Sequence, residues 1–279
     1  MSFETAPRPL ASVPPQDERG YFDPPVVPLN LADRGEVFAA HFREQFALPE
    51  GFTCGDPGVD GDDLRAATRA VMAAAKEHQV WVVLGSTHLL DERTRPHNCL
   101  YIINPQGEIV DRYDKRFCTG NSGKRPTMDL VHYSPGNHTT TFKIAGVTCA
   151  ALICYDYRFP ELFRELSAVG VKIVFQSFHN ARKMPVADQK YNIWRTIVPA
   201  TMCCRAAENH FWISASNTQA RPSQWGSFAV RPDGAIVGQL KLHKRGVLLT
   251  DMTIDPQLYD APGPWRARAI AGVLHSGEL

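Results

Sequence analysis

The chain has 279 residues, of which 44% are hydrophobic and 21% charged, as is ordinary for a globular protein. Its formal net charge is +1, which provides no overall field to attract nucleic acid or an anionic membrane surface. No apolar run is long enough to span a bilayer, and the proline-rich start lacks the apolar core of a signal peptide. We therefore expect a cytoplasmic protein that binds neither nucleic acid nor a membrane.

Seven cysteines are spread along the chain, and none of them belongs to a Cys-x-x-Cys pair. An odd number of cysteines, in a chain long enough to build its own core, argues against a disulfide framework. The adjacent Cys203 and Cys204 do not suit a tetrahedral zinc site, and His210, His243 and His275 lack paired ligand spacing. We expect reduced thiols and no bound metal.

The N-terminal segment differs in composition from the rest of the chain. Residues 1–32 are predicted to form a proline-rich arm, because the seven prolines before residue 29 exclude a continuous helix or a central strand. A helix is predicted over 33–46, where a capping-box spacing precedes apolar side chains at helical intervals. A second, alanine-rich helix is predicted over 62–78. Residues 33–279 are expected to form a single domain.

From residue 80 onward, short apolar runs alternate with turns and helices. Strands are predicted over 80–86, 99–104, 108–113, 142–144, 147–154, 171–177, 211–217, 225–230, 235–240 and 246–252. Helices are predicted over 159–169 and 187–209, the second bent at Pro199. The tail after Asp255 is rich in proline and glycine and is expected to run over the surface. Many strands with interleaved helices indicate a layered α/β domain.

The segment from Ile153 to Leu162 is the most informative for chemistry and reads Ile-Cys-Tyr-Asp-Tyr-Arg-Phe-Pro-Glu-Leu. Cys154 ends an apolar strand, and a helix begins shortly after it. Such a turn exposes the sulfur and directs backbone N–H groups toward it, which favours a thiolate and an oxyanion hole. A buried structural cysteine is the ordinary alternative, but this position at the end of a strand favours a nucleophile.

This segment resembles the nucleophile motif of the nitrilase superfamily of carbon–nitrogen hydrolases, in the Cys-Tyr-Asp form of its amidase-like branch. The stretch from Asp111 to Cys118, Asp-Arg-Tyr-Asp-Lys-Arg-Phe-Cys, is similar to the family's lysine motif. Tyr-Ser-Pro-Gly-Asn at 133–137 and Arg-Ala-Ala-Glu-Asn at 205–209 add matches in the family's order. The resemblance implies a four-layer α-β-β-α sandwich, a homodimer or larger homo-oligomer, and no cofactor.

The resemblance also implies two further catalytic residues beside Cys154. Lys115 would polarise the substrate carbonyl. If this motif stood alone, a solvated lysine in a turn would be the preferred interpretation. Glu50, within Leu-Pro-Glu-Gly-Phe-Thr-Cys-Gly, would be the general base. The predicted helix before Glu50, where the family has an apolar strand, leaves a simple loop glutamate as the alternative.

Three more residues are candidates for substrate binding. The backbone N–H of Tyr155 would hold the oxyanion together with Lys115. Asp129 is the nearest match to a second acidic residue of the family, so the resemblance implies a supporting role. His179 follows the strand after the nucleophile helix, where the family lines its pocket, and a simple loop histidine is the equal alternative.

The function that follows from the resemblance is hydrolysis of a small linear amide to a carboxylic acid and ammonia or an amine through a cysteine thioester. One alternative is a non-catalytic family member that has lost the glutamate site and binds a ligand or partner. A nitrilase acting on a C≡N bond is the other, and Tyr155-Asp156 after the cysteine argues against it. Three classes of substrate fit the sequence equally well: omega-amides, carbamoyl amino acids and short aliphatic amides.

Overall fold

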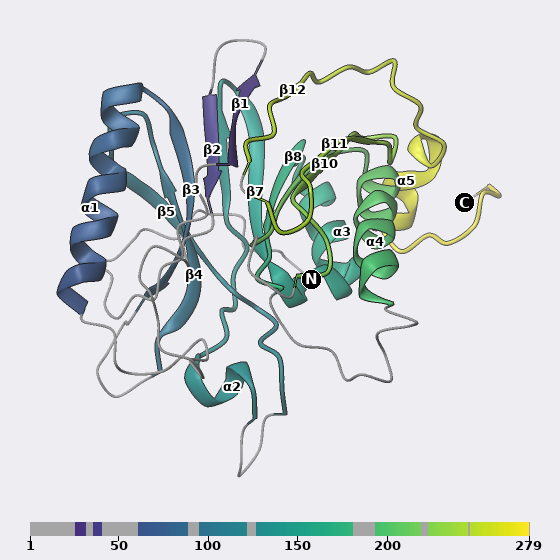
Figure 1. Cartoon of the computed structure of the whole chain (residues 1–279). Coiled ribbons are helices and arrows are strands. Elements are labelled where there is room, and N and C mark those ends of the chain that lie inside the picture. The colour runs from purple at the N-terminus through teal and green to yellow at the C-terminus, as the bar shows by residue number, and fades with distance from the viewer. Residues whose placement is uncertain are drawn as a thin grey trace.

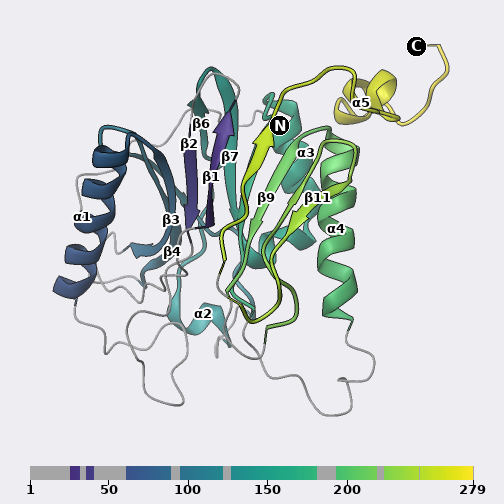
Figure 2. The same cartoon turned by 45° about the horizontal axis from the view of Figure 1, so that its top comes forward.

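The computed structural model of the chain describes residues 26–31, 36–40, 61–88, 95–121, 127–180, 193–218, 223–244 and 246–278. Two six-stranded sheets pack face to face, and helices cover their outer faces (Figure 1). Helix α1 (Gly61–His78) covers one sheet, and helices α3 (Pro160–Ala168) and α4 (Trp194–Asn209) cover the other. Figure 2 shows the same α-β-β-α order of layers from a second direction, and it is the fold expected from the sequence.

The first sheet has the strand order β12-β1-β2-β3-β4-β5. Its strands are β1 (Val26–Leu31), β2 (Glu36–Ala40), β3 (Trp81–His88), β4 (His97–Ile103), β5 (Ile109–Asp114) and β12 (Thr250–Met252). Strand β2 is parallel to β3, and β4 is antiparallel to both β3 and β5. The carboxyl ends of β2, β3 and β5 therefore lie at the same edge of this sheet.

The second sheet has the strand order β11-β10-β9-β8-β7-β6. Its strands are β6 (Thr141–Ile144), β7 (Val147–Ile153), β8 (Ile173–Ser177), β9 (Trp212–Ser216), β10 (Phe228–Val230) and β11 (Ile236–Gln239). Strands β7, β8 and β9 are parallel, with Ile153 opposite Ser177 and Ser177 opposite Ser216. Because this region is covered on both faces, its strands are nearly continuous apolar runs, and the loops that follow them meet at one edge.

The main hydrophobic core fills the space between the sheets and continues beneath α3 and α4. Across the interface between the sheets, Trp81 of β3 stacks on Phe142 of β6 with ring centroids 6.3 Å apart. Phe142 in turn stacks on Phe175 of β8 at 6.0 Å. A smaller cluster lies between α1 and the first sheet. Continuous packing between the sheets fixes the edges of the two sheets relative to each other.

The helix predicted over 33–46 is wrong, because residues 36–40 form strand β2 between β1 and β3. Strand β1 occupies the end of the expected N-terminal arm and pairs with both β2 and β12. It contains Pro28, and the register with β2 shifts between Val26 and Pro28. A proline is tolerated at such an irregularity because the ladder hydrogen bond it cannot donate is already interrupted.

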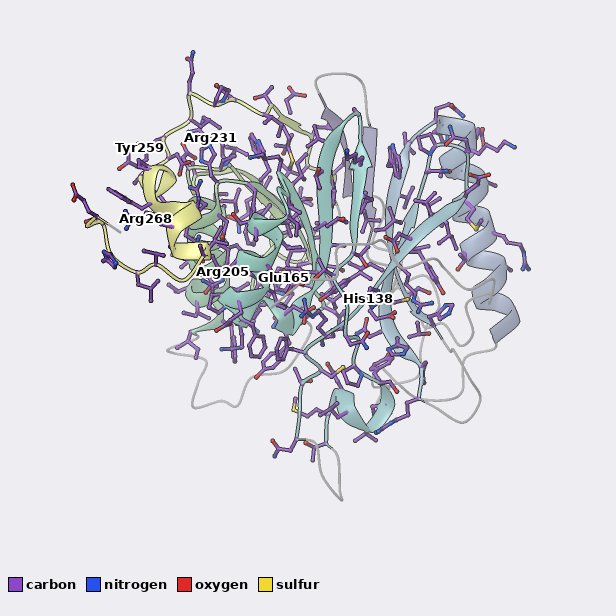
Figure 3. All side chains as sticks on the ribbon, turned by 180° about the vertical axis from the view of Figure 1, so that it is seen from behind. His138, Glu165, Arg205, Arg231, Tyr259 and Arg268 are labelled. Carbon is purple, nitrogen blue, oxygen red and sulfur yellow. The ribbon has the colours of Figure 1, made fainter. Side chains whose placement is uncertain are left out.

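The C-terminal tail also differs from the expected surface loop, because it contains helix α5 (Gly263–Ile270). A proline in the first turn suits this helix, since its missing N–H would have no partner there. Arg266 forms an ion pair with Asp260 and donates a hydrogen bond from Nε to the Glu208 carbonyl at the end of α4, at 3.0 Å. Tyr259 and Arg268, labelled in Figure 3, lie with α5 at the outer side of the molecule.

The other predicted elements agree with the structure within a few residues. Three pairs of consecutive predicted strands form antiparallel hairpins, β4–β5, β6–β7 and β10–β11. Helix α4 contains Pro199 and begins at Trp194, and residues 187–192 of the predicted helix lie outside the described residues. A short helix α2 (Asp129–His132) was not expected. In the described parts of the chain, no helix is long and apolar enough to cross a membrane.

Candidate active site

Cys154 lies at the point where strand β7 ends and the chain turns into helix α3. Its backbone has φ of +40°, a conformation that non-glycine residues rarely adopt. A single 3₁₀ turn, Cys154–Arg158, then leads to Pro160 at the start of α3. Such backbone strain persists only where the surrounding structure enforces it, and it concentrates at functional sites. The sulfur is presented, half-buried, at the carboxyl edge of a central parallel strand.

Lys115 directly follows strand β5 of the other sheet and is only 3% exposed. Its backbone N–H donates to the Asn98 carbonyl at 2.8 Å, and its ammonium forms an ion pair with Asp129. Burial by itself would lower the pKa of Lys115, but the nearby acidic groups of Cys154, Asp129 and Asp156 outweigh burial and raise it. The lysine therefore stays charged, and its side chain is fixed close to Cys154.

Asp129 begins the short helix α2 and contacts Lys115 directly. Its Oδ2 also accepts a hydrogen bond from the Thr119 backbone N–H at 3.1 Å. Burial would raise the pKa of Asp129, but the Lys115 ammonium holds it below its ordinary value of 3.8. Asp129 is therefore ionised at neutral pH. In the structure it contacts the Lys115 ammonium and the Thr119 backbone, and its part in substrate binding stays a prediction.

The thiol of Cys154 is not activated in the way its turn suggests. Burial raises its pKa, and Asp129 and Asp156 add to this rise. Lys115 and the backbone N–H of His179, which hydrogen-bonds to the sulfur, only partly oppose it. Burial and two nearby carboxylates therefore raise the pKa of the thiol more than Lys115 and the His179 N–H lower it, so the turn alone does not favour the thiolate. A protonated thiol requires a base before it can attack.

The loops after β8 and β9 close the edge beside the nucleophile. Phe178 to Asn180 follow β8, and the N–H of Asn180 donates to Oδ1 of Asn217 at 3.0 Å. Asn217 follows β9 and donates from Nδ2 to the Trp225 carbonyl at 2.7 Å. The network holds His179 beside Cys154 through its backbone. Sequence reasoning identified His179 but missed the asparagines that position its loop.

Aromatic rings surround the nucleophile turn. Phe178 meets Tyr157 and Trp225 edge to face, with centroids 5.8 and 5.5 Å away. The Arg158 guanidinium lies over Tyr155, Tyr157 and Trp194, at 5.7, 5.1 and 4.7 Å from the ring centroids. Among the described residues, Arg158 forms no ion pair with a carboxylate. Sequence reasoning missed this exposed cation, although it lies in the nucleophile motif.

Glu50, the expected general base, lies outside the described residues. The described part of the site therefore brings together Cys154, Lys115, Asp129, Tyr155 and the backbone of His179. In the same described part, no group of three or more His, Cys, Asp or Glu side chains is arranged to hold a metal ion. The arrangement places a thiol opposite a fixed positive charge, which suits attack on a carbonyl whose oxygen becomes negative.

The carbon-nitrogen hydrolase family model matches residues 39–259. The 2-oxoglutaramate amidase of Bacillus subtilis (strain 168) is 30% identical over 176 residues, which are 61% of this chain and 61% of that protein. The deaminated glutathione amidase of Yersinia enterocolitica is 29% identical over 185 residues, covering 61% of this chain and 59% of that protein. The chain thus matches about three fifths of the length of these relatives.

Solved structures show the same fold. The crystal structure of an amidase from Nesterenkonia sp. superposes with a TM-score of 0.53 at 20% identity, covering 65% of this chain and 64% of that chain. At this identity the likeness concerns the fold alone. The family match, however, includes both the lysine strand and the nucleophile turn. The chain therefore belongs to the carbon-nitrogen hydrolase family.

Proposed function

We propose that this protein hydrolyses a small linear amide to a carboxylic acid and ammonia or an amine through a thioester on Cys154. The observation that carries the proposal is the pairing of a strained, half-buried thiol with a buried ammonium that Asp129 holds in place. A cation fixed beside a nucleophile provides stabilisation where an oxyanion develops. The amidase relatives support the same reaction class.

In the acylation step, Glu50 takes the thiol proton, and the Cys154 sulfur attacks the amide carbonyl. The raised pKa of the buried thiol makes this transfer necessary, because little thiolate exists at neutral pH before substrate binds. The ammonium of Lys115 and the backbone N–H of Tyr155 stabilise the oxyanion. Collapse of the tetrahedral intermediate breaks the C–N bond, and Glu50 returns the proton to the leaving nitrogen.

In the deacylation step, Glu50 takes a proton from water, and the resulting hydroxide attacks the thioester carbonyl. The same two donors stabilise the second oxyanion. The C–S bond then breaks, and the proton returns to the sulfur. The sum is amide plus water giving acid plus ammonia or amine, with no electron transfer and no cofactor.

For the acyl group, we propose a linear amide that carries a negative charge at its far end. Arg158 is exposed, forms no ion pair in the described part of the chain, and its guanidinium is held over three aromatic rings of the nucleophile turn and α4. Tyr157 lies in the nucleophile turn three residues after Cys154, and burial raises the pKa of its hydroxyl while the Arg158 guanidinium opposes the rise. Arginine recognises carboxylates in a planar, two-point geometry. The names of two relatives, an oxoglutaramate amidase and a deaminated glutathione amidase, are consistent with this preference.

We also propose a homodimer or larger homo-oligomer. Large apolar side chains are exposed along the C-terminal segment, where they would be covered in an assembly: Val247, Leu249, Ile254, Tyr259, Trp265 and Leu274. Light scattering on the purified protein tests this, and a monomer at micromolar concentration would contradict it.

The function is tested by screening amides with ammonia release as the readout. The panel contains omega-amides with a terminal carboxylate, matched neutral amides of equal chain length, carbamoyl amino acids and short nitriles. We expect release from the acidic amides, a lower rate with neutral amides, and no release from Cys154→Ala. Replacing Arg158 by leucine should reduce the preference for the acidic member of each pair. Release from nitriles alone would favour nitrile hydrolysis, and binding without release would favour the non-catalytic alternative.

A further inference from the structure

We infer that Asp156 is a positioning residue that sets the separation of Lys115 and Cys154, because its carboxylate binds the backbone beside both of them. The inference rests on the proposed function, since it assigns a role within that site. Asp156 is two residues after the nucleophile and is fully buried.

Three hydrogen bonds define what Asp156 holds. Its Oδ2 accepts from the backbone N–H of Ile153, the residue immediately before Cys154, at 3.0 Å. Its Oδ1 accepts from the backbone N–H of Phe117, two residues after Lys115, at 2.9 Å. Oδ2 also accepts from the hydroxyl of Tyr113, two residues before Lys115, at 2.8 Å. One carboxylate therefore connects the nucleophile turn with both sides of the lysine.

The three partners suit an ionised carboxylate and no other group of the same shape. Two partners are amide N–H groups, which can only donate, so both oxygens must accept. An asparagine in the same place would direct its NH₂ at one of these donors and leave both groups unsatisfied in the interior. Burial raises the pKa of Asp156, while these hydrogen bonds and Lys115 oppose the rise. The chain therefore keeps a buried carboxyl group where an apolar residue would be easier to bury.

Other contacts also join the two segments, so Asp156 is not their only connection. Arg116 donates to Oε2 of Glu165 on α3 at 2.7 Å, and Thr139 donates to Oε1 of the same carboxylate. Figure 3 labels Glu165 on α3. The rings of Phe117 and Phe159 stack with centroids 3.6 Å apart. These contacts hold the segments together without touching the backbone next to Cys154, so Glu165 offers a matched control.

The consequence for catalysis is specific. Without its carboxylate at 156, the protein should still fold, but the lysine and the thiol should no longer face each other at the required distance. A misplacement of about 1 Å in an active site costs on the order of 100-fold in rate. Asp156→Asn should therefore lower kcat by about 100-fold, with KM changed less than about threefold, because the lost interaction is with the oxyanion.

Three variants and two readouts test this inference. Wild type, Asp156→Asn, Glu165→Gln and Tyr113→Phe are compared in amide turnover and in the rate of Cys154 alkylation by iodoacetamide. Alkylation needs the thiol but forms no oxyanion. It should therefore stay close to the wild-type rate in Asp156→Asn, whereas a disturbed fold would change both reactions. Glu165→Gln should keep kcat within about threefold, and Tyr113→Phe, which removes one of three donors, should lower it about three- to tenfold.

Several outcomes would overturn the inference: an Asp156→Asn kcat within threefold of wild type, an equal loss in Glu165→Gln, or parallel losses in turnover and alkylation. If Asp156→Asn does not fold, Tyr113→Phe decides, and an unchanged kcat in that variant would contradict the inference. Absence of turnover in the wild type would sink the proposed function instead. In that case crystal structures of wild type and Asp156→Asn decide, and an unchanged Nζ–Sγ distance would overturn the positioning role.

Discussion

Cys154 and Lys115 come from different sheets and are held in place by different means. Cys154 follows β7, which lies between β6 and β8, and its position is set by backbone pairing and a strained turn. Lys115 follows β5, which lies at the end of its sheet, and its ammonium is held by the carboxylate of Asp129. The nucleophile is thus positioned by the fold, whereas the lysine is positioned mainly by side chains.

This difference predicts how each half of the site responds to substitution. Single side-chain changes around Lys115 should reduce activity while the fold survives, because β5 is an edge strand that pairs with β4 alone. Around Cys154, a comparable effect should require a change that disturbs the backbone of the turn, as Asp156→Asn would through the lost acceptor of the Ile153 N–H. The pKa of the Cys154 thiol is raised, so the reaction also requires a general base in addition to the nucleophile and the lysine.

The largest effect is expected from removing that base. Glu50→Gln keeps the shape of the side chain but cannot accept the proton, so acylation and deacylation should both slow by about 1,000-fold. The control is Glu44→Gln, because Glu44 is the other glutamate between β2 and α1. Steady-state and single-turnover ammonia release measure both steps. Loss of activity in Glu44→Gln, with Glu50→Gln still active, would show that Glu44 is the base and that the assignment to Glu50 is wrong.

The next effect comes from Lys115. Lys115→Met keeps most of the side-chain volume and removes the charge, so kcat should fall by at least about 100-fold, roughly 3 kcal/mol, as for a lost oxyanion donor. Lys143→Met on β6 is the control, because Lys143 is exposed and carries no role in the site. More than about a tenth of wild-type activity in Lys115→Met would show that the lysine is dispensable.

Gly136 tests the lysine half through its backbone. Its N–H donates to the Lys115 carbonyl at 2.8 Å, and a Cβ at this position would lie 2.3 Å from the Asp114 carbonyl oxygen. Gly136→Ala should therefore displace the end of β5 and lower kcat on the order of 30-fold, with little change in thiol alkylation. Gly277→Ala is the control, since this exposed position has no left-handed backbone and its Cβ would make only ordinary contact, 3.4 Å from Nδ1 of His275. Equal kinetics in the two variants would contradict the account of the lysine half.

Asp129 should give the smallest of these effects. Asp129→Asn keeps a hydrogen-bond acceptor but removes the charge, so kcat should fall about tenfold, or about 1.4 kcal/mol, the difference between a charged and a neutral hydrogen bond. The pKa of Asp129 lies below its ordinary value of 3.8, so its ion pair stabilises the fold above that pH and is lost as the pH falls through the folded-state pKa. Melting temperatures of the two proteins should therefore converge as the pH falls below 3.8, and parallel curves would contradict this.

The strand-turn-helix around Cys154 could be predicted because its signals are local. An apolar run, Pro160 in the first helical turn and a glycine after the helix all fall within one short segment. Residues 36–40 could not be assigned correctly, because so short a segment fits a helix or a strand and only pairing with β1 and β3 decides. Helix α5 was missed for a similar reason, since its docking depends on the Arg266–Asp260 pair.

The chemistry of the site was predictable in its residue types but not in its electrostatics. The motifs identified Lys115 and Cys154, and the structure brings them together with Asp129. The raised pKa of the thiol depends on burial and on carboxylates that are distant in sequence. Similarly, Asp156 stands in the nucleophile motif, but two of its three donors come from Tyr113 and Phe117 of the lysine motif.

The central claim is that Cys154 forms a thioester with the acyl group of an amide, and intact mass spectrometry tests it most directly. Wild-type protein quenched in acid during turnover of a slow amide should gain the mass of one acyl group, and peptide mapping should place it on Cys154. Cys118 is the internal control, because burial raises the pKa of its thiol to about 11 and it should stay unmodified. Turnover with acylation of Cys118 and an unmodified Cys154 would contradict the account.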